Sequence, residues 1–204
     1  MTRLLETIMV SAGAVRNWQY HNARINRTRR DLFGSTDELD IRTITPPTNG
    51  HTGPVRCRVI YAGDILSVST EAYIRQPIRS LRLLRRDDIS YPYKFEERTQ
   101  FAEALQHRGN CDEILIVKHG RITDTSFSNV AFFNDRAWVT PAEPLLKGTM
   151  RQSLLDRGMI VEEDLRISDL KHFSQIMLIS ALWDFNLRTT LMMSDLSAVG
   201  FSLH

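Results

Sequence analysis

The chain has 204 residues, enough for one large domain or for two small lobes. Its composition, 42% hydrophobic and 25% charged, is typical of a globular protein and excludes a disordered, collagen-like or coiled-coil chain. No stretch approaches the roughly 18 apolar residues that a membrane span requires, so we expect no membrane partner. Two cysteines, Cys57 and Cys111, are too few for a disulfide scaffold, which favours a cytoplasmic protein.

Residues 1–86 are predicted to form a smaller N-terminal α+β lobe. Hydrophobic spacing predicts a hairpin, one helix, an irregular loop rich in glycine and proline, and three further strands. In chain order, the predicted bounds are 4–10 and 15–19 for the hairpin, 21–33 for the helix, 42–54 for the loop, and 55–61, 65–73 and 78–84 for the strands.

A linker at 87–92, where the hydrophobic spacing is lost, is predicted to lead into a larger C-terminal lobe at 93–204. The predicted helices of this lobe are 95–107, 149–157 and 168–173. Its predicted strands are 113–117, 129–133, 159–161 and 175–182, with the segments 121–125 and 138–141 left unassigned. Helices and strands interleave without a strict repeat, which favours a two-lobed α+β fold with mixed sheets over a doubly wound sheet.

Several familiar functional motifs are missing from the sequence. It contains no P-loop, no dinucleotide-binding glycine pattern, no nucleophile elbow of hydrolases and no zinc-protease motif. The six histidines lack metal-ligand spacing, so we expect no metal site. Basic runs at 24–30 and 79–86 would suit a phosphate backbone, but the net charge of only +2 favours a solvated surface and no nucleic-acid partner.

Amine chemistry would have to come from one of four lysines, because the other 22 basic residues are arginines, which keep their proton. Lys94 stands between Tyr93 and Phe95. Apolar surroundings lower the pKa of a lysine and favour the neutral amine that forms a Schiff base. The alternative is a lysine at a helix start whose charged end extends to water.

Two further segments fit the same chemistry. Asp124 lies in a small polar segment between apolar strands, where a carboxylate could keep a pyridine nitrogen protonated, although ordinary turn hydrogen bonds are the alternative. Gly148 and Thr149 open a predicted helix, and backbone N–H groups at a helix start attract phosphate, although a simple threonine cap is the alternative. A lysine, a carboxylate and a phosphate site together indicate pyridoxal 5′-phosphate.

The order of these motifs resembles the class IV aminotransferase family, the fold-type IV pyridoxal-phosphate enzymes. This family contains D-amino-acid aminotransferases, branched-chain aminotransferases and 4-amino-4-deoxychorismate lyases. The resemblance implies a D-amino-acid-aminotransferase-like fold, a homodimer, and transamination or lyase chemistry on an amino acid or amino-acid-like substrate. The segments that carry it are 5–7, 21–24, 93–95, 112–129, 139–141, 146–151 and 179–182.

The resemblance also implies a role for individual residues. Lys94 becomes the catalytic Schiff-base lysine and proton carrier. Asp124 is expected at the pyridine nitrogen with Asn129 in support, and Arg24 at the cofactor phosphate. The remaining expected cofactor contacts are Gly148, Thr149, Met150, Ser180 and Ala181, and the expected substrate contacts are Thr7 and Tyr20.

The sequence departs from the family pattern in two respects. Asp124 is one methylene shorter than the family's usual glutamate. The sequence also starts at the strand around residues 5–7, without the family's customary lead-in segment. Both departures favour a second hypothesis, a cofactor-binding protein with degenerate or no turnover.

Overall fold

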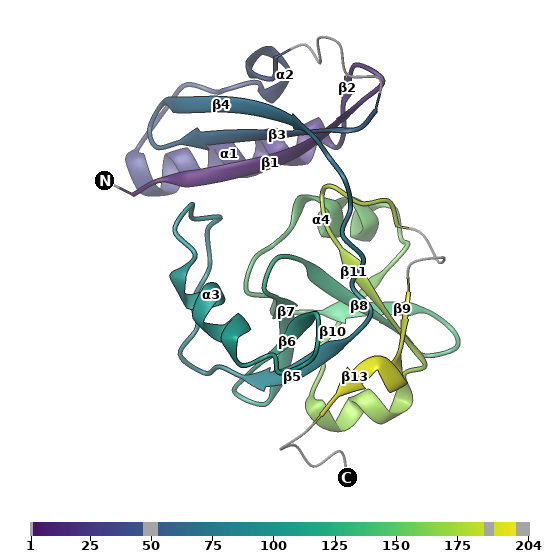
Figure 1. The fold of residues 1–204 in the computed structure, drawn as a ribbon. Coiled ribbons are helices and arrows are strands. Elements are labelled where there is room, and N and C mark those ends of the chain that lie inside the picture. Colours follow the sequence, from purple (N-terminus) through teal and green to yellow (C-terminus); the bar gives the residue numbers. More distant parts are fainter. Residues whose placement is uncertain (1, 47–52, 186–189, 199–204) are drawn as a thin grey trace. The chain divides into compact units, whose positions relative to one another are not determined.

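The structure is a computed structural model that describes residues 2–46, 53–185 and 190–198, and within these the chain forms two compact units (Figure 1). Unit 1 contains Met1–Gln76 and Tyr93–Glu97. Unit 2 contains Pro77–Pro92 and Arg98–His204. This division differs from the predicted lobes, 1–86 and 93–204. Residues 81–85 pair with residues 113–117 and so belong to unit 2, whereas Phe95 pairs with Leu4 and so belongs to unit 1.

Unit 1 contains one antiparallel sheet with the strand order β2-β1-β3-β4 and two helices. The bounds are β1 Leu4–Ser11, β2 Ala14–Val15, α1 Trp18–Phe33, α2 Ile41–Ile44, β3 Val55–Tyr61 and β4 Ile65–Ala72. Alternate residues of β1 and β3 pack against Ile25 of α1 and Ile41 of α2 in one buried cluster. Buried residues recur along α1 at positions 21, 24, 25, 28 and 29, the spacing of one helix face.

Local backbone geometry explains the differences from prediction in unit 1. The predicted second hairpin strand, 15–19, is wrong, because Asn17 adopts a left-handed conformation with φ of 50° and α1 starts directly after it. The predicted loop 42–54 includes the short helix α2, whose first turn is capped by Asp40 accepting from the Arg42 amide at 3.0 Å. Residues 47–52 of that loop lie outside the described residues.

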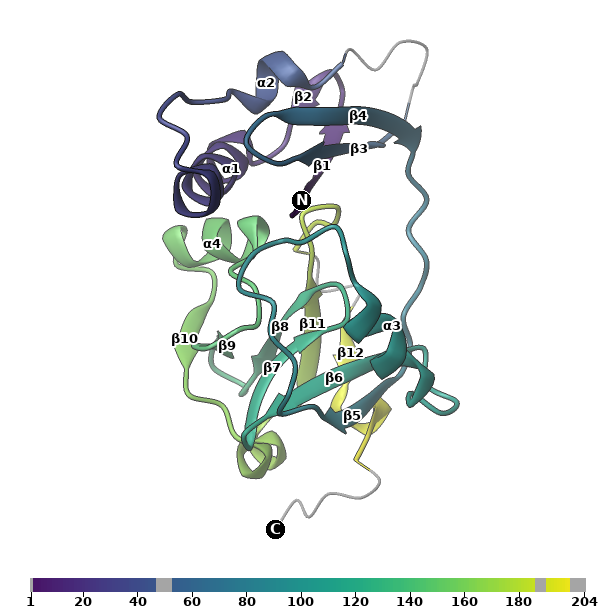
Figure 2. The same ribbon diagram turned by 90° about the vertical axis from the view of Figure 1, so that its left-hand side faces the viewer.

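Unit 2 contains two sheets, with the strand orders β10-β9-β8-β11-β12 and β13-β5-β6-β7 (Figure 2). Parallel pairs, such as β5 with β6, occur beside antiparallel pairs, such as β6 with β7, which confirms the predicted α+β class with mixed sheets. The strand bounds are β5 Leu81–Arg85, β6 Glu113–Lys118, β7 Arg121–Thr125, β8 Asn129–Phe133, β9 Trp138–Pro141, β10 Val161–Glu163, β11 Gln175–Ile179, β12 Leu191–Met192 and β13 Leu196–Ser197. The helix bounds are α3 Thr99–Gln106, α4 Thr149–Asp156, η1 Ile167–His172 and η3 Met193–Asp195.

Long-range pairing accounts for the differences from prediction near the linker. The predicted helix 95–107 starts only at Thr99, because Phe95 pairs with Leu4 beside β1 and is extended. The predicted strand 78–84 is observed as β5, whose five residues all pair with β6. Lys94 therefore belongs to unit 1, whereas the sequence suggested the C-terminal lobe.

The chain contains no helix, among the residues described, that is both long and apolar enough to cross a membrane.

Arg29 is the largest fully buried side chain of unit 1 and fixes the loop after α1. Its Nε donates to the backbone oxygen of Gly63 at 2.7 Å, and its Nη1 donates to the backbone oxygen of Asp37 at 2.9 Å. Its Nη2 lies 2.9 Å from each carboxylate oxygen of Asp37. One side chain therefore satisfies backbone acceptors from two separate loops.

We expect Arg29→Met to lower the free energy of unfolding by about 2–4 kcal/mol, because the backbone oxygens of Gly63 and Asp37 and the Asp37 carboxylate all lose the buried guanidinium that donates to them. Arg30→Met is the matched control, since Arg30 forms only an exposed ion pair with Glu38 and should cost at most about 1 kcal/mol. Chemical denaturation of both variants measures the difference. Equal losses would contradict the structural role of Arg29.

Candidate functional site

A fully buried ionic cluster joins β1 to α1 in unit 1. Arg24 donates to the two carboxylate oxygens of Glu6 at 2.7 and 2.6 Å, and His21 Nδ1 lies 2.6 Å from the second oxygen. His21 and Arg24 are three residues apart, so they lie on the same face of α1. The sequence assigned Arg24 to a phosphate group but did not assign a partner to it. Glu6 is that partner, and its signal was a lone acidic residue inside an apolar strand.

The pKa values of both Glu6 and His21 in this cluster are lowered. Burial alone would raise the pKa of Glu6, but the guanidinium of Arg24 and the hydrogen bond to His21 outweigh burial and hold it at about 2. Burial also lowers the pKa of His21, and the positive charges of Arg24 and Lys94 lower it further. His21 is therefore neutral at neutral pH and donates from Nδ1 to a permanently ionised Glu6.

Lys94 lies in an extended segment beside the start of β1. The Leu5 amide donates to the backbone oxygen of Lys94 at 2.9 Å, and the Glu96 amide donates to that of Arg3 at 3.0 Å. Lys94 itself is half-buried. The alternative of a lysine at a helix start is wrong, because α3 begins five residues later.

The two expected substrate contacts lie on different elements of unit 1. Thr7 is half-buried on β1, directly opposite Arg58 of β3. Tyr20 is half-buried in the first turn of α1. The structure thus brings Arg24 and Lys94 into one electrostatic neighbourhood around His21.

In unit 2, Asp124 is the centre of a second buried hydrogen-bond network. Its Oδ1 accepts from Asn129 Nδ2 at 2.8 Å, and its Oδ2 accepts from the Leu146 amide at 3.0 Å. Asn129 Nδ2 also donates to the Leu146 backbone oxygen at 2.8 Å. The network ties β7 and β8 to the loop that leads into α4. It brings Asp124 and Asn129 together, and their roles at the cofactor stay predictions.

The protonation of Asp124 is set mainly by its surroundings. Burial raises the pKa of its carboxyl to about 6, while the hydrogen bonds from Asn129 and Leu146 and the charge of Arg151 act in the opposite direction. Asp124 forms no ion pair with another residue of the described segments. This carboxyl therefore lacks the cationic partner that buried carboxylates usually have.

Gly148 places the start of α4 against Asn129. Its φ of −71° is open to any residue, so the backbone conformation does not require glycine. A Cβ added at this position would lie 2.0 Å from Asn129 Oδ1 and collide with it, so the close approach requires a residue without a side chain. Gly148 also leaves α4 without a side-chain cap. The sequence reasoning missed this close approach of Gly148 to Asn129.

The other expected phosphate-pocket residues lie near α4 and after β11. Thr149 and Met150 are buried in the first turn of α4, and Ser180 and Ala181 are half-buried. Met150 and Ser180 line one gap, together with Leu154 and Trp183, that is too small to hold a water molecule. The structure therefore brings Met150 and Ser180 together, while Ala181 does not line this gap.

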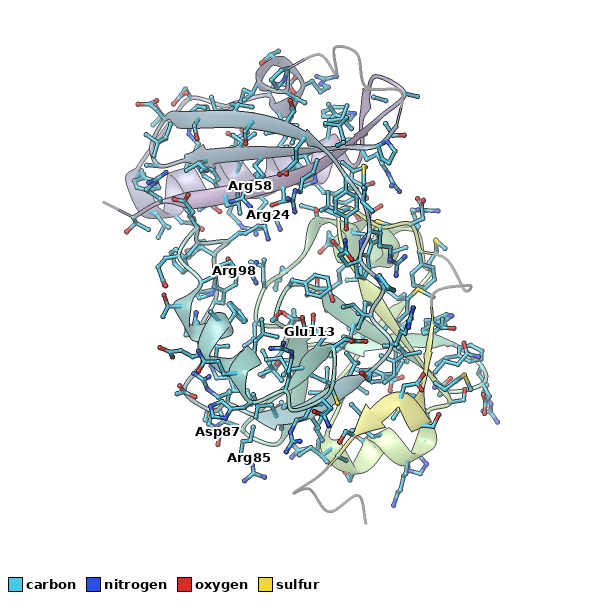
Figure 3. The ribbon with its side chains drawn as sticks, viewed as in Figure 1. Arg24, Arg58, Arg85, Asp87, Arg98 and Glu113 are labelled. Atoms are coloured by element: carbon cyan, nitrogen blue, oxygen red, sulfur yellow. The ribbon has the colours of Figure 1, made fainter. Side chains whose placement is uncertain are left out.

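A second buried acid that the sequence did not single out supports the loop after Asp124. Glu113 accepts from the amide and hydroxyl of Ser126 at 3.2 and 2.8 Å, and burial raises the pKa of its carboxyl. Arg98, labelled with Glu113 in Figure 3, donates to the Ser126 backbone oxygen. Both partners are far from Ser126 in sequence, so no local pattern revealed them.

Neither a metal centre nor the pocket described next coincides with these residues. Within the described segments, no three His, Cys, Asp or Glu side chains are grouped so as to hold a metal ion. A pocket of about 250 Å³ in unit 2 is lined by Tyr91, Lys118, Arg121 and Thr123 among others, and it includes none of the expected site residues.

Comparisons with known proteins identify the family of the chain. The family model described as amino-transferase class IV matches residues 3–185. A protein of Haemophilus influenzae whose function is not described is 32% identical over 185 residues, which cover 89% of this chain and 98% of that protein.

Solved structures show the same fold. The crystal structure of a "putative 4-amino-4-deoxychorismate lyase" from Haemophilus somnus has a TM-score of 0.81 and 30% identity, with 89% of this chain and 97% of that chain covered. The PLP-bound form of "a hypothetical aminotransferase" from Mycobacterium tuberculosis has a TM-score of 0.72 and 19% identity, with 89% and 78% covered. These structures confirm the predicted fold.

The pKa values of the two buried carboxyls, Glu6 and Asp124, should be shifted in opposite directions. In the cofactor-free protein we expect Asp124 to titrate near pH 6, while Glu6 stays ionised for as long as the chain is folded. Because the folded-state pKa of Asp124 exceeds its unfolded value, its contribution to stability falls as the pH rises through that window. Carbon-13 NMR of the side-chain carboxyls measures both midpoints. A midpoint near 4 for Asp124 would contradict its described burial.

Proposed function

Because the chain belongs to the class IV aminotransferase family, we propose that it is a pyridoxal 5′-phosphate-dependent enzyme acting on an amino acid or amino-acid-like substrate. The observation that carries this proposal is the buried Asp124 carboxyl, held by Asn129 and Leu146 and without an ion-pair partner among the residues described. A protonated ring nitrogen would supply the missing positive charge. The Mycobacterium tuberculosis structure named above as PLP-bound supports the choice of cofactor.

The residues of unit 2 fit such a cofactor. Asn129 donates to one Asp124 oxygen and the Leu146 amide to the other, and a carboxylate has about four acceptor positions in all, so it can accept a further hydrogen bond. At the start of α4, Gly148 provides no side chain that would cap the helix, and the helix dipole favours an anion there. Thr149 and Met150 would bind the phosphate through their backbone amides, with Ser180 and Ala181 completing the pocket.

Unit 1 would supply the reactive amine and a fixed positive charge. Lys94 would bond to the aldehyde and, once released, carry the proton of the substrate's α-carbon. Arg24 would bind the phosphate, and its bidentate contact with Glu6 would hold the guanidinium in one orientation. Because Glu6 stays ionised and His21 neutral, this orientation would not depend on pH near neutrality.

When bound, pyridoxal phosphate supplies an aldehyde that bonds to amines and a protonated ring that accepts electrons from a bond broken at the α-carbon. Asp124 would keep the ring nitrogen protonated despite being shorter than the family's usual glutamate. Its contacts with Asn129 and Leu146 support this role, because they fix the carboxyl within a buried network.

The reaction type is supported most directly by the Haemophilus somnus relative, which is described as a "putative 4-amino-4-deoxychorismate lyase" and is 30% identical. We therefore place lyase chemistry first and transamination second. A homodimer is part of the same proposal, as the family resemblance implies, and so is a cytoplasmic location, which the two cysteines favour.

We expect the protein loaded with pyridoxal phosphate to be yellow and to convert at least one donor among aminodeoxychorismate, D-alanine and branched-chain amino acids. Lys94→Ala should lose both the colour and the turnover, because the amine that bonds the aldehyde is gone. Lys147→Ala is the matched control and should retain both, since Lys147 is exposed and has no proposed role. Visible absorbance and product analysis provide the measurements.

Each alternative result has a definite meaning. A yellow Lys94→Ala protein would show that another lysine bonds the cofactor. A yellow wild-type protein without turnover of any donor would favour the second hypothesis, a cofactor-binding protein that does not act as an enzyme.

A further inference from the structure

We propose that Glu113 is a positioning residue for Asp124. It fixes the direction of the Asp124 carboxyl by holding Ser126, two residues further along the chain. This inference rests on the proposed function, in which that carboxyl contacts the ring nitrogen of the cofactor. It gives a role in the reaction to a buried acid that has no proposed contact with cofactor or substrate.

The backbone at Asp124 forms a β-bulge. The paired residues on its two sides are Ile122–Val117 and Thr125–Leu115 of β7 and β6. Between these pairs, β7 has two residues and β6 has only one. A bulge turns a side chain out of the regular alternation of a strand. The contacts that fix the bulge therefore determine where the Asp124 carboxyl points.

Side-chain contacts with β6 hold the bulge on both sides of Asp124. Ahead of it, the Thr123 hydroxyl donates to the Ile116 backbone oxygen at 2.9 Å. After it, Glu113 accepts from the amide of Ser126 at 3.2 Å and from its hydroxyl at 2.8 Å. The second contact takes over where the pairing of β7 with β6 ends, because Thr125 is the last paired residue of β7.

Ser126 is held at its third polar group as well. Arg98, labelled with Glu113 in Figure 3, donates to the Ser126 backbone oxygen. Glu113 itself accepts only from Ser126 and the Ile114 amide, and it forms no ion pair with any residue that the structure describes. Burying a carboxyl without an ion pair is costly, so a role beyond packing is the more economical explanation of Glu113.

The turn after Asp124 transmits the constraint to Asn129. The Thr125 amide donates to the Ser128 backbone oxygen, and the Ser128 amide donates to the Thr125 hydroxyl, both at 2.9 Å. Asn129 follows directly and donates to Asp124 Oδ1 at 2.8 Å. Because Ser126 lies inside this closed turn, holding Ser126 fixes both ends of the contact between Asp124 and Asn129.

The short side chain of Asp124 makes the position of its backbone decisive. One CH2 group joins an aspartate carboxyl to the backbone, whereas two join that of a glutamate, which therefore has one more torsion to adjust. Any shift of the backbone at Asp124 is passed directly to its carboxyl oxygens. A clamp on the bulge thus suits a chain in which aspartate replaces the family's usual glutamate.

Amide hydrogen exchange of Glu113→Ala tests the inference in the cofactor-free protein. The Leu146 amide reports the position of the carboxyl, because it donates to Asp124 Oδ2 at 3.0 Å. The Ile122 amide is the internal control, because it lies before the bulge and donates to the Leu165 backbone oxygen at 2.8 Å. We expect the variant to speed exchange at Leu146 at least about 10-fold more than at Ile122.

The protein loaded with pyridoxal phosphate provides a second readout. Glu113→Ala should stay yellow but lose about 10- to 100-fold in kcat, with KM changed far less, because a group displaced by about 1 Å costs that much. Nitrogen-15 NMR should show its ring nitrogen losing the proton at a lower pH than in wild type. Glu113→Gln should behave nearly as wild type, since its amide can still bond to both groups of Ser126.

Asp135→Gly is the matched control in unit 2. Asp135 also accepts from a serine hydroxyl, that of Ser174 at 2.8 Å, but beyond the other end of β8. Its φ of 65° suits glycine, so the substitution removes the contact without strain. This variant should keep the wild-type kcat, ring-nitrogen signal and Leu146 exchange.

A purely structural role of Glu113 would give a different result. Equal acceleration of exchange at Leu146 and Ile122, or an unchanged ring nitrogen and kcat in Glu113→Ala, would overturn the inference. If Glu113→Ala does not fold, Ser126→Ala removes the hydroxyl contact alone and should show the same changes at smaller size. A wild-type protein that binds no pyridoxal phosphate would contradict the proposed function, whereas the exchange result needs no cofactor and is independent of it.

Discussion

The burial of the Asp124 carboxyl is the constraint on which the account depends. Three hydrogen bonds among Asp124, Asn129 and Leu146 connect β7, β8 and the loop before α4. The same network requires glycine at 148, because any side chain there would collide with Asn129. A structural network of this kind usually contains its own compensating charge. Here Asp124 forms no ion pair with the residues described, and a protonated ring nitrogen would provide one.

The buried acid of unit 1, Glu6, has the opposite pKa shift. Glu6 is as deeply buried as Asp124, but the Arg24 guanidinium keeps its pKa at about 2, whereas that of Asp124 is raised to about 6. Glu6 therefore acts as a fixed negative charge that orients an arginine, while the Asp124 carboxyl has a pKa close to neutral pH. The two acids fit different tasks, positioning a phosphate-binding group and stabilising a ring nitrogen, because their neighbours differ.

Short sequence patterns correctly predicted the helices and strands whose bounds are determined by residues close together in the sequence. The start of α4 at Thr149 followed from Gly148 and Thr149, and the strands β3 and β8 were predicted with the bounds observed. The predicted bounds were wrong where contacts between residues distant in sequence determine the local structure. Phe95, predicted to be helical, is extended because it pairs with Leu4. The sequence indicated Lys94, Arg24 and Asp124 through a family resemblance, but it did not indicate Glu6 as the partner of Arg24, because the two residues meet only in the folded chain.

The protonation state of the cofactor's ring nitrogen tests the central claim most directly. Nitrogen-15 NMR of the protein loaded with ring-labelled pyridoxal phosphate would report it. The account predicts a protonated nitrogen in the wild-type protein at neutral and mildly alkaline pH, and loss of that proton in Asp124→Ala. An unprotonated nitrogen in the wild-type protein, or one that stays protonated in Asp124→Ala, would contradict it.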